Sequence, residues 1–205
     1  MIRGLGIAAL LLFSLPLLGQ EAIVPQKFQA ELLAQAIFEA TNQLRLREGL
    51  EAFKANEALQ NAARYQAERM AKRRRLQHKW PGDKKYGSPR QRIQAFEGNY
   101  NRTGENIAQD YLLDIPSGKA YFINSKGQAT QQGGTPIPYR SYQQLAQKVV
   151  KDWYLSPGHR ANLLGDFEFI GIAASFLVPE KKGPNFDVYL VQNFGKWKKR
   201  SYSLF

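Results

Sequence analysis

Residues 169–176 read FIGIAASF and residues 186–194 read FDVYLVQNF, and these two stretches decide the class of the fold. Both are rich in β-branched and aromatic residues, and a loop of charged and turn-forming residues, 179–184, separates them. Such runs, bounded by turn residues, are typical of β-strands. The pattern predicts two antiparallel strands in the last quarter of the chain.

The sequence before these strands has the period of amphipathic helices. Apolar residues recur in steps of three and four between residues 28 and 48, and Gly49 ends the predicted helix. A second helix is expected from the N-cap residue Asn56 to about Arg74. A third begins at the N-cap residue Ser141 and ends at residues 156–158, followed by a short helical turn over residues 159–164. The third helix is expected to bury Leu145, Val149 and Trp153.

Two stretches, residues 76–104 and 114–139, are rich in glycine and proline. They are expected to form long ordered loops with short turns rather than regular elements. A third strand is expected near residues 106–113 or 120–124. Three helices followed by a β-hairpin predict an α+β fold in which helices cover a small sheet, and 205 residues predict one domain.

The N-terminus has the pattern of a secretory signal peptide. Met1-Ile2-Arg3 gives a positive start, residues 4–18 are apolar but short for a membrane span, and cleavage is expected after residue 19. The alternative is a short membrane anchor. After cleavage, residues 20–29 form a short N-terminal segment and residues 30–205 one domain without a further long apolar run. The mature protein is therefore expected to be secreted or periplasmic.

The composition limits the available chemistry. The chain has no cysteine, which excludes disulfides, thiolate metal ligands, a cysteine nucleophile and a lipid-bearing cysteine. The formal net charge of +12 favours contact with anionic envelope polymers or lipid headgroups. Nucleic acid is not expected as a dedicated partner of an exported protein.

The two histidines, His78 and His159, both lie just past predicted helix ends, where functional sites are common. Together with the carboxylate of Glu105 they form a ligand set suited to a divalent metal such as zinc. The three residues are far apart in sequence, so each histidine has the alternative of a structural or surface role. Trp80 is either a ligand-stacking wall beside His78 or a packing residue of the loop.

The order of the motifs resembles the CAP superfamily of cysteine-rich secretory proteins, antigen 5 and plant pathogenesis-related proteins. It is most similar to the bacterial branch of SCP-type extracellular proteins. The similarity extends over residues 30–195. It is carried by Asn42, Arg45, Gly49-Leu50, Asn56, Leu59, Ala63, Met70, His78, Gly104-Glu105-Asn106-Ile107-Ala108, Trp153, residues 156–164 (SPGHRANLL), Phe167, Ile170-Gly171-Ile172 and residues 191–195 (VQNFG).

The resemblance implies an α-β-α sandwich, with helices flanking a small antiparallel sheet, and a cleft lined by His78, Glu105 and His159. It also implies metal binding in this cleft, which family members show. Many members outside the bacterial branch have a second glutamate where this chain has Ser156, and their second histidine comes from a later segment. A site with two carboxylates is therefore not expected here, and Ser156 is expected to line the cleft.

The resemblance favours a secreted binding module whose cleft accepts a small or extended ligand, such as a lipid, glycan or peptide, with or without a divalent metal. The sequence contains no cysteine nucleophile, GxSxG elbow or HExxH helix, which agrees with a non-catalytic role. The alternative is a metal-assisted hydrolase in which Glu105 acts as the general base. No cofactor beyond a divalent ion is implied.

Overall fold

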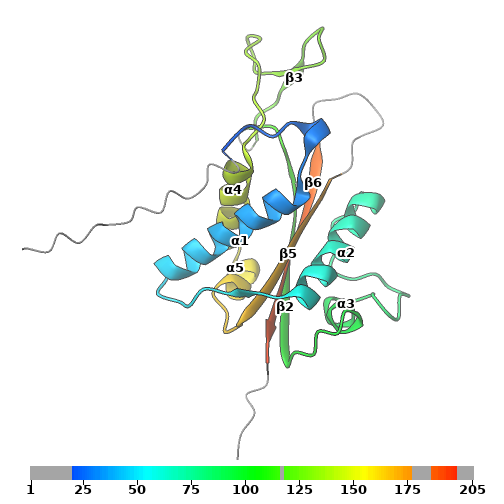
Figure 1. Cartoon of the computed structure of the whole chain (residues 1–205). Helices are drawn as coiled ribbons and strands as arrows, with labels where there is room; N and C mark the ends of the chain where they lie inside the picture. Colours follow the sequence, from blue (N-terminus) through cyan, green and yellow to red (C-terminus); the bar gives the residue numbers. More distant parts are fainter. Residues whose placement is uncertain (1–19, 116–117, 177–185, 198–205) are drawn as a thin grey trace, which may run out of the picture.

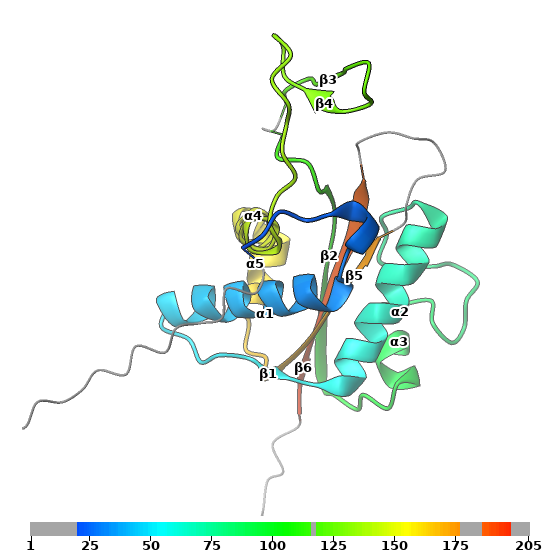
Figure 2. The ribbon, with the colours of Figure 1, turned by 45° about the horizontal axis from the view of Figure 1, so that its top comes forward.

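A computed structural model describes residues 20–115, 118–176 and 186–197. In these residues the sheet forms the middle layer, with α1, α4 and α5 on one side and α2 and α3 on the other (Figures 1 and 2). The α+β class and the α-β-α sandwich are confirmed. The elements are η1 Pro25–Lys27, α1 Ala30–Arg47, β1 Lys54–Ala55, α2 Glu57–Arg73, α3 Pro89–Ala95, β2 Arg102–Tyr111, β3 Phe122–Ile123, β4 Ala129–Thr130, α4 Tyr142–Leu155, α5 Pro157–Leu163, β5 Phe169–Phe176 and β6 Asp187–Lys196.

The main sheet has the strand order β1-β5-β6-β2. β5 and β6 pair in antiparallel fashion, which confirms the predicted hairpin. The expected third strand is β2, which begins at Arg102, ahead of the region predicted for it, and pairs antiparallel with β6 along its length. The short strand β1 pairs parallel with β5, so the sheet is mixed rather than wholly antiparallel. Because β2 comes last in the order, it is an edge strand.

The stretch 114–139, expected as a loop, carries a small hairpin of its own. β3 and β4 pair in antiparallel fashion, and the hairpin projects away from the sandwich (Figures 1 and 2). Its turn lies at Asn124–Gly127, where Gly127 has a positive φ of 75°. Asn124 Oδ1 accepts hydrogen bonds from the N–H groups of Lys126 and Gln128, as turn asparagines do.

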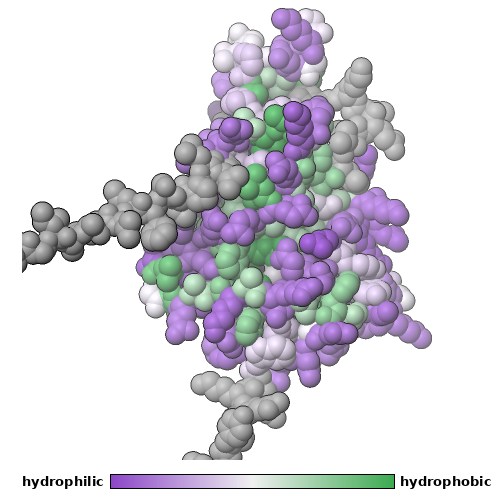
Figure 3. All heavy atoms as spheres, in the orientation of Figure 1, coloured by the Kyte–Doolittle hydropathy of each residue, from purple (hydrophilic) through white to green (hydrophobic). Residues whose placement is uncertain are grey.

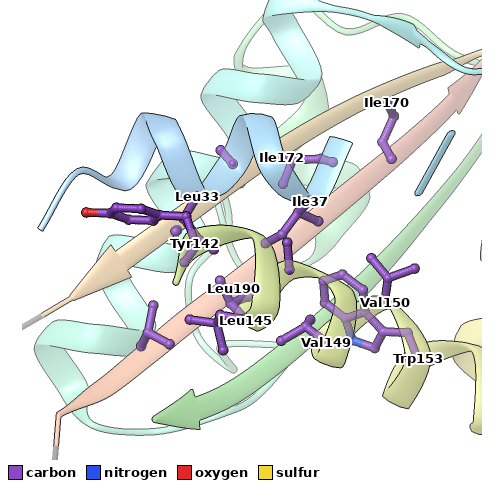
Figure 4. Close-up of a cluster of buried hydrophobic side chains, with 14 of the residues drawn as sticks. Leu33, Ile37, Tyr142, Leu145, Val149, Val150, Trp153, Ile170, Ile172 and Leu190 are labelled. Carbon is purple, nitrogen blue, oxygen red and sulfur yellow. The ribbon is translucent and has the colours of Figure 1, made fainter. Parts of the chain in front are cut away.

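Alternate residues of the central strands face different helical layers. Ile172 of β5 and Leu190 of β6 pack toward α1 and α4 (Figure 4). Their neighbours Ala173 and Val191 pack against the α2 side. The apolar residues predicted for the third helix lie in the first of these clusters together with α1 side chains, and this set comprises Leu33, Ile37, Leu145, Val149 and Trp153. The two faces of the sheet are thus both buried.

The three predicted long helices are confirmed, with ends that differ by at most a few residues. Asn56 caps α2, because its Oδ1 accepts from Leu59 N–H at 3.2 Å. Ser141 and Gln144 form a reciprocal capping box at the start of α4. The predicted stop at residues 156–158 both ends α4 and begins α5, since Pro157 occupies the first turn of the new helix.

The prediction of an irregular segment over residues 76–104 is wrong for residues 89–95, which form α3. This helix begins with two recognised signals. Ser88 Oγ accepts from Gln91 N–H at 3.3 Å, and Pro89 occupies the first turn. A helix of seven residues is too short for a hydrophobic period to show, which is why the pattern did not reveal it.

The expected signal peptide, residues 1–19, and the loop 179–184 lie outside the described residues. None of the helices described here is long and apolar enough to cross a membrane. Hydrophilic side chains cover most of the face shown in Figure 3, and apolar side chains appear between them in small patches.

We expect Gly171→Ala to destabilise the protein by about 1–3 kcal/mol. A β-carbon at this position would lie 2.1 Å from Gln60 N and 2.2 Å from Leu59 C, which are main-chain atoms of α2. Chemical denaturation measures the change. Gly158→Ala is the control, because nothing lies within 4 Å of its β-carbon position, and it should leave stability unchanged or slightly raised. Equal stabilities of the two variants would contradict the close approach of α2 to β5.

Candidate functional site

The candidate site lies at the outer edge of the sheet, on β2. His78, from the segment after α2, hydrogen-bonds to Glu105 of β2. His159 belongs to α5, on the other side of the sheet, and Asn106 Nδ2 donates to its carbonyl oxygen at 3.2 Å. Consecutive strand residues point to opposite faces, so Glu105 and Asn106 reach the two layers in turn. The fold therefore brings both histidine segments to the same strand edge from opposite faces of the sheet.

Glu105 is the buried centre of this arrangement, with a side chain only 1% exposed. Its Oε1 accepts from His78 Nδ1 at 2.8 Å, and its Oε2 accepts from Arg92 Nη2 at 2.7 Å. Asn193 lies opposite on β6, and its amide nitrogen reaches Oε2 at 3.3 Å in the orientation that satisfies both ends of the amide. Since Nδ1 of His78 is committed to Glu105, Nε2 remains for an outside ligand.

Arg92 is the site residue that sequence analysis missed. Its side chain is fully buried, and besides Glu105 it donates to the carbonyl oxygens of His78 at 3.0 Å and Tyr86 at 3.1 Å. It therefore ties both ends of the loop 78–86 to the carboxylate that holds the imidazole. The Ser88-Pro89 helix start was the available signal for its helix, but arginine in a polar stretch is ordinarily exposed, so nothing marked its burial.

His159 is half-buried, and its environment favours the neutral imidazole. Burial lowers the pKa of His159, and the nearby charge of His78 lowers this pKa further. The two rings are thus close enough to interact electrostatically, and at pH 7 His159 has a free lone pair for a ligand. Because the pKa of His159 is lower in the folded protein, the unfolded chain binds a proton at this imidazole more tightly than the folded protein does. Acidification below about pH 6.5 therefore favours unfolding through this group.

A groove of about 370 Å³ runs along the outer edge of β2. Its floor is the strand from Ile107 to Tyr111, residues of α4 and the start of α5 form one wall, and Leu76 lies on the other side. Ser156 and His159, two of the residues expected in the cleft, line it, whereas His78 and Glu105 are not among its lining residues. The remaining lining residues are Ala108, Gln109, Asp110, Lys148, Val149, Asp152 and Trp153.

Trp80 is a packing residue rather than a wall of the groove. It is 6% exposed, and its Nε1 donates to Gln66 Oε1 of α2 at 2.9 Å. The guanidinium of Arg69 lies over the ring at 4.6 Å and covers it from solvent. Of the two interpretations of Trp80, the structure therefore agrees with loop packing, and the stacking role is wrong.

The side chains of the site that could donate to a metal are the imidazoles of His78 and His159. The described part of the chain contains no group of three or more His, Asp or Glu side chains that could hold a metal ion. Glu105 is near, but both of its oxygens are engaged, so it orients His78 and is not itself a free ligand. Two imidazoles are fewer than the three or four protein ligands that zinc sites ordinarily have, so water and the ligand would have to fill the remaining positions.

A comparison with sequence models of protein families gives the family. The sequence model of the cysteine-rich secretory protein family, CAP, matches residues 38–194. The uncharacterized protein YkwD of Bacillus subtilis is 30% identical over 137 residues, which is 66% of this chain and 40% of YkwD. The chain thus spans well under half the length of this relative.

Solved structures show the same fold. An extracellular protein containing an SCP domain from Bacillus anthracis matches with a TM-score of 0.55 and 21% identity, over 86% of this chain and 45% of that protein. An outer surface protein of Borrelia burgdorferi also matches with a TM-score of 0.55, at 22% identity, over 85% of this chain and 100% of its own. Sequence identities of 21% and 22% show that the fold is shared and carry no conclusion about function.

We expect Arg92→Met to destabilise the protein by about 3–5 kcal/mol, because it leaves the buried carboxylate of Glu105 without its cation. Urea denaturation measures the loss. Arg90→Met, an exposed change on the same helix, is the matched control and should lie within about 0.5 kcal/mol of the parent. A small effect of Arg92→Met would mean that the ion pair does not hold this segment.

We expect His78→Gln to raise the pKa of His159, because it removes one of the two causes that lower it. The shift should be partial, since burial of His159 remains. Proton NMR titration of the imidazole signals measures it, and the chain has only two histidines, so the remaining signal is assigned at once. Lys79→Gln, which removes a neighbouring exposed charge, is the control. An unchanged pKa in His78→Gln would show that the rings are too far apart to interact.

Proposed function

Because this chain belongs to the cysteine-rich secretory protein family, we propose that it is an exported ligand-binding module that uses the groove along β2. The signal-peptide pattern of residues 1–19 supports export, with residues 30–205 as the single exported domain. Two structural relatives are described as an extracellular protein and an outer surface protein, which agrees with this location. The positive charge of the chain favours a position beside anionic polymers or headgroups of the cell envelope.

The observation that carries this proposal is that His159 lines the groove and that His78 lies close enough to interact with it electrostatically. His78 is held by the buried carboxylate of Glu105, and His159 is kept neutral by burial and by its neighbour. A carboxylate behind a histidine fixes the ring and raises its basicity as a ligand. The pair can therefore hold a divalent ion such as zinc, which when bound would supply a positive centre for an anionic or carbonyl group of the ligand.

The geometry supports binding better than hydrolysis. A general base must reach the proton it removes, either directly or through one water. Glu105 is buried, and its two oxygens already accept from His78 and Arg92, so it has the position of an orienting group. The metal-assisted hydrolase with Glu105 as general base therefore has no geometric support.

Zinc titration of the purified mature chain tests the proposal. We expect zinc to bind to the parent protein, and His78→Gln and His159→Gln each to weaken binding about tenfold or more, because each removes one of two nitrogen ligands. Glu105→Gln should weaken zinc binding by about 10–100-fold through the loss of the charge behind His78. Isothermal titration calorimetry measures these affinities.

Glu31→Gln, an exposed carboxylate in the first turn of α1, is the control and should bind zinc as the parent does. Thermal denaturation of each variant without zinc separates a lost ligand from a lost fold. Equal zinc affinity in the parent and in both histidine variants would remove the metal from the proposal.

A further inference from the structure

The outer edge of β2 presents main-chain hydrogen-bonding groups to the groove. Leu112 N–H donates to Phe186 O, and with the register of the two strands this places the main-chain groups of the even-numbered residues 104–110 toward β6. The odd-numbered residues of β2 turn theirs outward. Three outward carbonyl oxygens accept hydrogen bonds from side chains beyond the sheet, and these belong to Glu105, Ile107 and Tyr111.

Side chains cap main-chain groups of this edge on both sides of Gln109. Asn162 Nδ2 donates to Glu105 O at 3.3 Å, and Trp153 Nε1 donates to Ile107 O at 3.3 Å. Arg140 Nη1 donates to Tyr111 O at 2.9 Å. Tyr111 N–H is held by Asp110 Oδ1 at 2.8 Å. Gln109 lies between the capped positions, and no group in residues 20–115, 118–176 or 186–197 bonds to its outward N–H and C=O or to the N–H of Ile107.

We propose that the groove binds an extended peptide segment, which adds a short strand to the outer edge of β2 at Ile107–Gln109. The inference rests on the proposed function, because it uses the same groove and names the class of ligand. The open edge offers two donors about 7 Å apart and one acceptor. An extended polypeptide presents carbonyl and N–H groups of alternate residues at this spacing, so one short segment satisfies all three.

Other ligand classes match this edge less well. A lipid chain carries no donor or acceptor for Gln109, and sugar hydroxyls do not repeat with the spacing of a strand. A second folded copy would have to bring its own sheet edge into the groove, between the wall of α4 and α5 and the side chain of Leu76. A single extended chain has no such requirement, so the edge favours it.

The alternation of side chains also predicts what the peptide should contain. In antiparallel pairing, the peptide residue opposite Gln109 exchanges two hydrogen bonds with it, and its side chain lies on the same face as that of Gln109. Leu76, which is 44% exposed, flanks this face, so an apolar residue is expected there. The two neighbouring peptide residues face α4, where Lys148 Nζ pairs with Asp110 and Asp152 at 2.7 and 2.8 Å, so polar residues are expected.

Selection from a phage-displayed library of random heptapeptides, followed by synthesis of the selected peptides, tests the inference. Gln109→Pro removes one outward donor and places a ring at the edge, while the bonds to β6 belong to even-numbered residues and remain. We expect this variant to bind a selected peptide at least tenfold more weakly than the parent. Gln109→Ala keeps the main-chain donor, and as the matched control it should bind as the parent does.

Backbone N-methylation of the selected peptide gives a second test that leaves the protein unchanged. Methylation of the residue that donates to Gln109 O should weaken binding at least tenfold, and methylation of the next residue, whose N–H points away, should leave it nearly unchanged. The alternating effect of N-methylation along the peptide tests strand addition even if Gln109→Pro is found to be misfolded.

Three outcomes would overturn the inference: no enriched peptide, equal binding to Gln109→Pro, or no alternation on N-methylation. Sedimentation that shows a dimer of the parent but a monomer of Gln109→Pro would assign the edge to a second copy and also overturn it. The two proposals fail separately. A protein that binds zinc through both histidines but selects no peptide refutes only this inference, and one that selects peptides at Gln109 without binding zinc refutes only the metal.

Discussion

Two buried charges, the carboxylate of Glu105 and the guanidinium of Arg92, join three segments at the edge of the sheet. Taking such a pair out of water costs several kcal/mol per ion, and the mutual attraction offsets this only where the remaining polar groups are bonded. Most of the remaining polar groups of this pair are hydrogen-bonded, since Arg92 also donates to two carbonyl oxygens and Glu105 also accepts from His78. Arg92 Nε, in contrast, is buried without a partner in the described structure, which costs stability. The ion pair therefore contributes more to the positioning of the site than to stability, because it holds the imidazole of His78 in one orientation.

The regular elements could be predicted because local chemistry determines them. Asn56 and Ser141 cap helices through their own side chains, and the β5–β6 hairpin is rich in the β-branched and aromatic residues that favour strands. The position of α3 could not be read from periodicity, because seven residues complete barely two turns. Its N-terminal signals, Ser88 and Pro89, were present, and the loop-like composition around them concealed the helix.

The candidate site was predictable in its residues but not in their roles. His78, Glu105 and His159 are the residue types that bind metals, and the resemblance to a family named them together. Spacing could not show that Glu105 would turn both oxygens inward, because the group that draws one of them, Arg92, gives no sign of burial in the sequence. The stacking role of Trp80 failed for the same reason. Its position depends on Gln66, a helix residue whose inward direction only packing reveals.

The edge of β2 shows how one strand can connect the two layers and still remain partly open. An unpaired edge is a liability for any sheet, because it invites other chains to pair with it. This protein caps part of the edge, with Asn162, Trp153 and Arg140 at three outward carbonyls. No group in the described residues caps the main-chain N–H and C=O of Gln109, and Lys148 of the adjoining wall pairs with two aspartates instead. An open stretch of strand edge, in a groove that His159 also lines, has the form of a binding site rather than of an unprotected edge.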